Sequence, residues 1–474
     1  MTRTSAVLLT LTLAACATTA PDADSRRSDA LRASSTDPCS RADAPAIGSK
    51  IPWFHDDAAT ALQCARDTDR PVLIDLWAPW CHTCMSMKHT VLLDPGLAAL
   101  ADRFVWLAID TDRPKNAEIV STLRPEVWPT FLVVSPDLQV QARYLGSASV
   151  AQFREFLGTG ERGHVDSRAA SGSLAANDPM RLIRDGDRAA MAGDLEVAGR
   201  AYLAALEHSC ADWPRRPDLL VSTIGVLHRQ QDWDGCVRFS LQHMAETGRS
   251  ASAADFCYYA ADCATHVDDA GLRRQIQTRS FERLEALIAD ATAPMSVDDR
   301  SDALRILREL HEAQGDIAAA RMAAQHQRSL LDTAARSAAD ARAASTYNWP
   351  RAEVYVYLGE GRALVDELTL STEALPEDYD PPYRLAWVLL QVGDADKALG
   401  PAQRAADLAY GPRKARILRL LAEVHRARGD VDGERRARQD VVSAVRNLPE
   451  GMRRPGDLEQ AEAELLSITA PTKP

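Results

Sequence analysis

The sequence has few aromatic residues, no long apolar run and a deficit of positive charge. Phe, Trp and Tyr make up 6% of the 474 residues. No apolar stretch approaches the roughly 18 residues of a membrane-spanning helix. The 67 Asp and Glu residues outnumber the 55 Lys and Arg residues, and the resulting net charge of −12 argues against nucleic acid as a partner. The composition, 46% hydrophobic and 26% charged, excludes a wholly disordered or collagen-like chain.

The N-terminus has the pattern of an export signal. Arg3 precedes a short apolar core, and small residues follow it up to Cys16. The segment from Leu13 to Cys16 resembles the lipoprotein box of bacterial lipoproteins. That resemblance implies a signal peptide over residues 1–15, acylation of Cys16 and a membrane anchor in the cell envelope that faces the periplasm. Ala17 resembles the outer-membrane sorting signal. The alternative is an ordinary secretory signal with an incidental cysteine.

Composition and periodicity divide the remaining chain into four segments. Residues 16–48 are rich in Ala, Ser, Thr and Asp without periodicity, which is typical of a flexible tether. Strand and helix patterns alternate over residues 49–158 and predict an α/β domain. Residues 159–178 contain glycine and serine and are predicted to be a linker. Residues 179–468 lack strand patterns and are predicted to be all-helical.

The helical segment repeats a phrase built on a Gly-Asp turn. A small residue usually follows five positions after the glycine, and the last two turns are 36 residues apart, near the 34-residue period of tetratricopeptide repeats. The segment resembles the tetratricopeptide-repeat family, which implies an extended array that binds a protein partner. A non-repetitive helical bundle is the alternative. The turns lie at Gly193-Asp194, Gly315-Asp316, Gly393-Asp394 and Gly429-Asp430, with a degenerate copy at Gln231-Asp232 that carries Cys236 in place of alanine.

The nine cysteines fall into three groups: Cys16, the pair Cys81 and Cys84, and the other six. If Cys16 is lipidated, an even number remains for an oxidising compartment. Cys81 and Cys84 form a Cys-x-x-Cys motif. Cys257 and Cys263 lie on different faces of one predicted helix and cannot bond to each other there. The remaining pairings stay open. Cys39 can bond to Cys64, and one or two bridges between neighbouring helices can form among Cys210, Cys236, Cys257 and Cys263.

The Cys-x-x-Cys motif follows a strongly apolar strand pattern over residues 71–77. The strand is predicted to deliver Cys81 to the start of a helix, where unpaired amides and the helix dipole stabilise a thiolate. Two intervening residues bring the Cys84 sulfur within bonding reach. One cysteine can therefore attack a substrate while the other resolves the mixed disulfide.

Residues 51–158 resemble the thioredoxin superfamily. The resemblance rests on Asp75, on the Trp80-Cys81-x-x-Cys84 motif and on Trp128-Pro129-Thr130, which matches the cis-proline loop. It implies that Cys81 is the nucleophile, Cys84 the resolving thiol and Asp75 a buried proton acceptor. It also implies that Trp80, Trp128 and Pro129 contact the substrate. The phrase from Thr90 to Pro95 is closest to periplasmic thiol:disulfide interchange domains.

The sequence departs from that family at three positions. His82-Thr83 replaces the Gly-Pro pair of cytosolic thioredoxins, and His82 is expected to favour the Cys81 thiolate. Trp106 stands where thioredoxins carry a lysine near the buried aspartate, so the proton path around Asp75 is expected to differ. Trp128 is bulky and is expected to line the substrate groove.

A zinc site and a haem attachment site are weaker explanations of the Cys-x-x-Cys motif. No second Cys-x-x-Cys supplies the other ligands of a zinc site, and Met85 follows Cys84 where haem attachment needs histidine. Copper handling is a stronger alternative, because Met85, Met87 and His89 extend a set of soft ligands. A purely structural disulfide between Cys81 and Cys84 would not explain the presence of Asp75, Trp80 and Pro129. No cofactor is therefore expected beyond the redox-active disulfide itself.

The sequence predicts an anchored thiol:disulfide oxidoreductase that acts on protein thiols or disulfides and is regenerated by an unknown redox partner. An alternative function is a repeat scaffold whose thioredoxin module only binds peptides. The predicted fold is an α/β thioredoxin-like domain followed by an all-α repeat domain.

Overall fold

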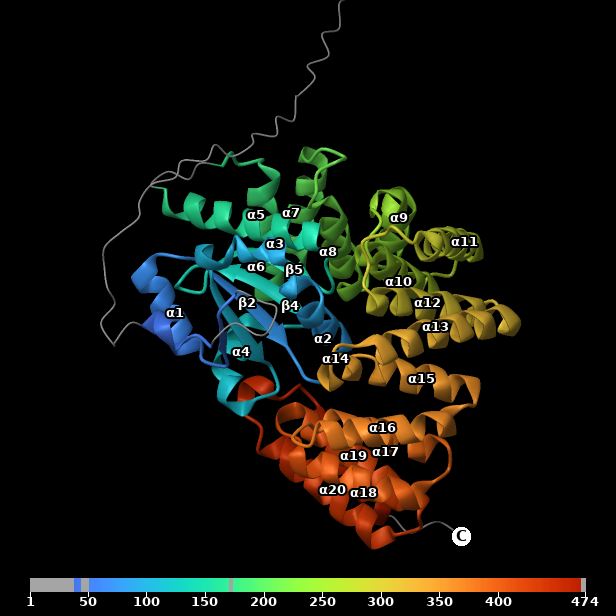
Figure 1. Ribbon diagram of the computed structural model, residues 1–474. Helices are drawn as coiled ribbons and strands as arrows, with labels where there is room; N and C mark the ends of the chain where they lie inside the picture. Colours follow the sequence, from blue (N-terminus) through green and yellow to red (C-terminus); the bar gives the residue numbers. More distant parts are fainter. Residues whose placement is uncertain (1–37, 44–50, 170–173, 470–474) are drawn as a thin grey trace, which may run out of the picture.

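The computed structural model describes residues 38–43, 51–169 and 174–469. The predicted signal peptide, Cys16 and most of the tether lie outside these ranges. An α/β domain (residues 51–168) precedes an all-helical region (residues 179–469), which confirms the predicted fold class (Figure 1). Among the described helices, none is both long enough and apolar enough to span a bilayer.

Five strands form one mixed sheet in the order β1-β3-β2-β4-β5. The strands β1 and β2 run parallel to β3, whereas β4 is antiparallel to both β2 and β5. The short strand β1 was not expected, because three residues are too few for a periodic signal. The strands are β1 (Trp53–His55), β2 (Val72–Trp77), β3 (Val105–Asp110), β4 (Thr130–Val134) and β5 (Val140–Leu145).

Helices cover both faces of this sheet, as parallel strands require. Central strand β2 is almost wholly buried and leads directly to the Cys-x-x-Cys motif. The last helix runs to Arg168, so the first half of the predicted linker at 159–178 is helical. The buried side of this extension consists of glycine and polar residues, so the sequence shows no apolar stripe that would predict a helix there. The helices are α1 (Ala58–Thr68), α2 (His82–His89), α3 (Pro95–Ala98), α4 (Ala117–Leu123) and α5 (Val150–Arg168).

The helical region is built largely from antiparallel helix pairs. Its members are α6 (Pro179–Ala192), α7 (Leu195–His208), α8 (Arg216–Arg229), α9 (Trp233–His243), α10 (Ala251–Thr265), α11 (Ala270–Ala289), α12 (Val297–Ala313), α13 (Ile317–Ser337), α14 (Ala341–Ser345), α15 (Asn348–Leu358), α16 (Val365–Ala374), α17 (Asp380–Gln391), α18 (Ala395–Leu408), α19 (Gly411–Ala427), α20 (Val431–Arg446) and α21 (Asp457–Thr469).

The Gly-Asp turns connect the helices of these pairs. Each glycine is left-handed, with φ between 72° and 84°, and the aspartate that follows begins the next helix. Left-handed backbone favours glycine, which explains the repeated phrase. In the degenerate copy, Gln231 adopts the same left-handed conformation with φ 57°. The small residues Ala198, Cys236, Ala320 and Ala398 are all fully buried, so paired helices pack closely there.

The helical region curls around the α/β domain, with α2 on the inside of the arc (Figure 1). It contacts that domain at its beginning, where α6 packs on β5, and in its middle, where α12 and α14 pack on α2. It contacts it again near its end, where the turn η7 (Glu450–Met452) packs on α4. The redox motif therefore faces the helical region.

A close backbone approach and a buried polar network also join the two parts. A Cβ atom at Gly411 would lie 1.8 Å from the Asp112 carbonyl oxygen, so only glycine fits where α19 meets the end of β3. At the other end of the arc, Arg143 of β5 donates to the Tyr202 hydroxyl at 2.8 Å and pairs with Asp187 at 3.4 Å. All three side chains are buried, so the first repeat and the sheet share one polar network.

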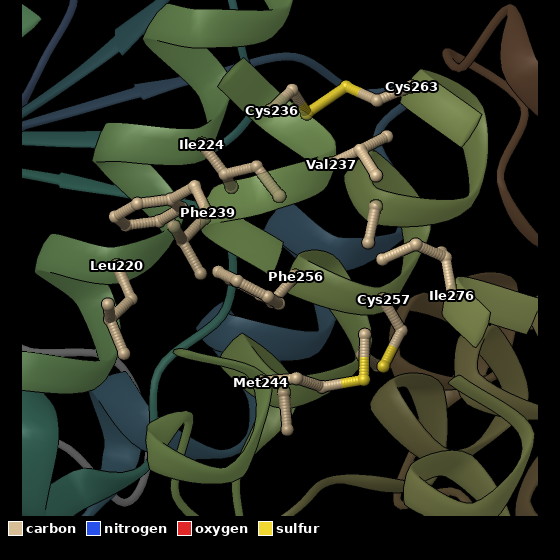
Figure 2. Packing of buried hydrophobic residues seen from close by; sticks show 14 of the residues in the cluster. Leu220, Ile224, Cys236, Val237, Phe239, Met244, Phe256, Cys257, Cys263 and Ile276 are labelled. Carbon is tan, nitrogen blue, oxygen red and sulfur yellow. A yellow bond between two sulfur atoms is a disulfide. The ribbon is translucent and has the colours of Figure 1, made fainter. Parts of the chain in front are cut away.

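Disulfides fasten both parts of the molecule. Cys39 pairs with Cys64, and Cys236 pairs with Cys263 across α9 and α10. Figure 2 shows the second bond at the border of a cluster that contains Phe239 and Phe256. Cys257 is a buried free thiol in the same cluster.

Replacing Gln231 by glycine should stabilise the protein, because it relieves a left-handed conformation that a side chain disfavours. The expected gain is roughly 0.5–1 kcal/mol. It should appear as a higher denaturation midpoint in urea. Gln230→Gly is the matched control, since Gln230 has right-handed helical geometry and should lose stability on substitution. An equal effect of both variants would contradict the conformational explanation.

Candidate functional site

The two cysteines of the motif lie at the start of α2, bonded to each other. Cys81 is the N-cap residue, and its sulfur accepts the backbone N–H of Cys84 at 3.0 Å. Helix N-termini stabilise a thiolate through such N–H groups. Cys81 is 5% exposed and Cys84 1% exposed, so Cys81 is the more accessible sulfur.

Asp75 is a buried carboxylate on β2, and its charge is balanced by a lysine. Lys88 Nζ, from the last turn of α2, lies 2.9 Å from Asp75 Oδ2. The same ammonium lies 4.2 Å from the centre of the Trp77 ring, within range of a cation–π contact. The cation beside the aspartate therefore comes from the active-site helix.

The strand position expected to hold such a cation carries none. Trp106 of β3 pairs with Leu73, and its ring nitrogen donates to the Ala101 carbonyl oxygen at 3.0 Å. The residue opposite Asp75 on β3 is Ala108. The surroundings of Asp75 therefore differ from the expected family pattern, with Lys88 in place of a strand lysine.

The Trp128–Pro129 peptide bond is cis. The Trp128 ring nitrogen donates to Thr111 Oγ1 at 2.8 Å, and its ring packs against Trp80 with centroids 5.5 Å apart. These two rings pack against the cluster that contains Cys81 and Cys84. Trp80 and Trp128 thus lie against the disulfide, Trp128 forms the cis bond with Pro129, and Asp75 lies on the strand that leads to the motif.

Residues 53–136 match the family model described as thioredoxin-like. These residues form a thioredoxin-like domain. The match ends before β5 and the helical region.

The chain is also similar to solved structures of helical-repeat proteins. A tetratricopeptide repeat protein from Parabacteroides merdae is 12% identical with a TM-score of 0.39, and the alignment covers 62% of this chain and 99% of that one. A thermophilic tetratricopeptide protein from Thermus thermophilus is 13% identical with a TM-score of 0.22, and the alignment covers 61% and 99% of the two chains.

The helical region contacts Trp80 through two arginines. The Trp80 carbonyl oxygen accepts from Arg384 at 3.1 Å, and the Arg413 guanidinium lies 5.0 Å from the centre of its ring. Its ring nitrogen donates to Asp112 at 2.7 Å, and Asp112 also accepts from the Tyr379 hydroxyl at 3.3 Å. Burial raises the pKa of Asp112. The tryptophan beside the redox pair is therefore part of the interface between the thioredoxin-like domain and the helical region.

His82 makes a second link between the motif and the helical region. Its Nδ1 lies 2.8 Å from Asp298 Oδ1, at the start of α12. Burial would lower the pKa of His82, but the carboxylates of Asp298, Asp302 and Glu353 outweigh that effect and raise it to about 9. His82 is therefore a cation at neutral pH, and its charge is shared with Asp298 rather than directed at Cys81 alone.

Metal-binding side chains near the motif are already engaged. Among the described residues, His82, Asp298 and Asp302 place ligand atoms within 4.8 Å of one another, but the imidazole holds a proton against Asp298. The Met87 sulfur accepts from the Ala148 N–H at 3.4 Å and is buried in the core. Met87 is explained by packing, which weakens the copper alternative.

Sequence reasoning missed the partners of the motif rather than the motif itself. Lys88 lies four residues after Cys84, on the same side of α2, and this helical spacing was the available signal. Asp298, Arg384 and Arg413 lie more than 200 residues from the motif. No local pattern connects such distant positions.

Replacing Lys88 should show how much its ion pair with Asp75 stabilises the folded protein. Lys88→Met leaves a buried carboxylate without a cation and should cost about 3 kcal/mol of unfolding free energy. Adding Asp75→Asn should recover part of that loss, because the unpaired charge disappears. Denaturant titration of both single variants and the double variant gives the coupling. Lys115→Met is an exposed control, and additive effects of the first two changes would contradict the ion pair.

The His82 ion pair should make stability depend on pH above neutrality. The pKa of His82 is about 9 in the folded protein against 6.5 for the free side chain, so its stabilisation is complete below pH 6.5 and is lost as the pH rises through about 9. The loss should amount to roughly 1–3 kcal/mol.

Denaturation midpoints between pH 6 and 9.5 measure this loss as the difference between the native protein and His82→Gln. His208→Gln, at an exposed histidine, should retain the native pH profile. If the denaturation midpoint of His82→Gln changes with pH in parallel with that of the native protein, the His82–Asp298 pair contributes nothing to the pH dependence of stability.

Proposed function

We propose that the protein is a thiol:disulfide oxidoreductase that acts on protein thiols or disulfides. The observation that carries the proposal is the Cys81–Cys84 disulfide at the start of α2, packed against the cis-proline loop. The thioredoxin-like match over residues 53–136 supports the same chemistry. The helical region is the proposed binding surface for a protein partner.

In the reducing direction, the Cys81 thiolate attacks one sulfur of a substrate disulfide and releases the other as a thiolate. A mixed disulfide between Cys81 and the substrate results. The Cys84 thiol then gives its proton to Asp75 and attacks Cys81 Sγ. This step forms the Cys81–Cys84 disulfide and releases the second substrate thiolate. The oxidising direction is the reverse, and a redox partner regenerates the starting state.

We further propose that the protein is a lipoprotein of the bacterial cell envelope. The Leu13 to Cys16 segment supports this location, and so does the use of cysteine elsewhere in the chain. Disulfides outside the motif, among them Cys39–Cys64 and Cys236–Cys263, are typical of an oxidising compartment.

The order of attack gives the test of the redox function. Cys84→Ser removes the resolving sulfur, so mixed disulfides with envelope proteins should accumulate on non-reducing gels. Cys81→Ser should accumulate at least tenfold fewer. Cys257→Ser is the control, because it removes a buried thiol outside the motif and should trap nothing.

Equal trapping by the Cys81 and Cys84 variants would contradict the proposed order. Peptide binding without any turnover by the native protein would favour the scaffold function.

A further inference from the structure

A cavity of about 230 Å³ lies between the thioredoxin-like domain and the helical region. One wall comes from the redox domain, through Thr83, Trp128 and the segment from Leu145 to Ser147. The other wall comes from α8, α10 and α12. Tyr258 lines the cavity and is 44% exposed, so the cavity reaches the surface there. Its volume suits one side chain better than a whole small-molecule ligand.

The cavity lies directly beside the cis-proline loop. The Gly146 N–H donates to the Pro129 carbonyl oxygen at 2.9 Å. A Cβ atom at Gly146 would lie 3.5 Å from Asp255 Oδ2, which places that carboxylate against Gly146. Gly146 therefore lies between Asp255 of α10 and Pro129 and contacts both of them.

The lining of this cavity is short of positive charge. It contains the carboxylates of Asp255, Asp299 and Asp302, but only one cation, Arg305. Arg305 is shared with Glu309, 2.9 Å away, and with Asp302, 3.6 Å away. The nearby cation of His82 is engaged by Asp298.

Asp255 differs from the other two carboxylates because it has no partner. Asp299 accepts the Ser296 N–H at 2.8 Å, and Asp302 faces Arg305. Asp255 makes no hydrogen bond or ion pair with any residue in the described part of the chain. Burial, together with the charges of Asp302 and Asp299, raises the pKa of Asp255 to about 8 against the opposing charge of Arg305. The carboxyl therefore holds a proton at neutral pH, and a cation that enters the cavity would displace it.

Apart from Thr83 and Ser147, the remaining lining is mostly apolar or aromatic. Val221, Ile306 and Trp128 contribute apolar surface, and Tyr258 and Tyr259 contribute rings. An aliphatic chain that ends in a cation matches this combination. Its methylene groups would lie along the apolar wall, and its charge would meet the unpaired carboxylate.

We propose that this cavity binds a lysine or arginine side chain of the substrate, close in sequence to the cysteine that Cys81 attacks, with Asp255 as the residue that pairs with it. The inference rests on the proposed redox function and names its substrate class as basic segments around a cysteine. The α10 and α12 walls belong to the helical region, so specificity comes from both parts of the chain.

Peptide disulfides test this proposal. Each peptide has one cysteine in disulfide linkage to glutathione and one variable position within two residues of it, occupied by lysine, norleucine or glutamate. Steady-state reduction by the full chain should give a KM for the best lysine peptide about tenfold below that for its norleucine counterpart. The glutamate peptide should be the poorest, and kcat should change little among the three.

Asp255→Asn should raise the KM for the lysine peptide to within about twofold of the norleucine value. Asp268→Asn, which removes the same charge from an exposed loop after α10, should leave the lysine preference unchanged. Because the folded pKa of Asp255 is about 8 against 3.8 for the free side chain, its ionisation costs stability increasingly above pH 4 and fully at pH 8 and above. Asp255→Asn should therefore also raise the denaturation midpoint, most strongly at pH 8 and above. That readout separates loss of binding from loss of folding.

Three outcomes distinguish the proposals. Turnover of all three peptides at equal KM would overturn the cationic pocket while the redox function stands. A lysine preference that survives Asp255→Asn would overturn the role of Asp255 and with it the pocket. No turnover of any peptide, with the native fold intact, would overturn the redox function and the inference with it.

Discussion

The ion pair between His82 and Asp298 links the redox motif to a helix that begins more than 200 residues later. Two charges removed from water are costly unless they meet in good geometry, so this contact fixes how α12 lies against α2. The hydrogen bonds of Trp80 and Asp112 fix the other flank of the motif in the same way. Between these two anchored flanks, the redox pair faces the inside of the helical arc.

This arrangement makes the helical region part of the proposed site rather than an appended module. Its walls complete the cavity beside Pro129, and its side chains cover Trp80. The carboxylates of this cavity come from the helical region and not from the thioredoxin-like domain. The proposed selection of the substrate is therefore separated physically from the proposed sulfur chemistry, although the two lie side by side.

Much of the fold was readable from local patterns. The Cys-x-x-Cys motif after an apolar strand, the Trp128-Pro129 dipeptide and the Gly-Asp turns each depend on a few neighbouring residues, and the structure has all of them in the predicted conformations. Short or polar elements escaped detection. Strand β1 has only three residues, and the second half of α5 has too weak an apolar stripe to mark its end.

The sequence alone determined the proposed redox site, because a thiolate at a helix start needs only the strand, the two cysteines and their spacing. Only the tertiary structure decided what surrounds that chemistry. Asp298 reaches His82, and Asp255 reaches Gly146 beside the cis-proline loop, because the arc of helices packs back against the α/β domain. Such contacts depend on how whole helices pack, and packing at this distance leaves no spacing in the chain from which it could be read.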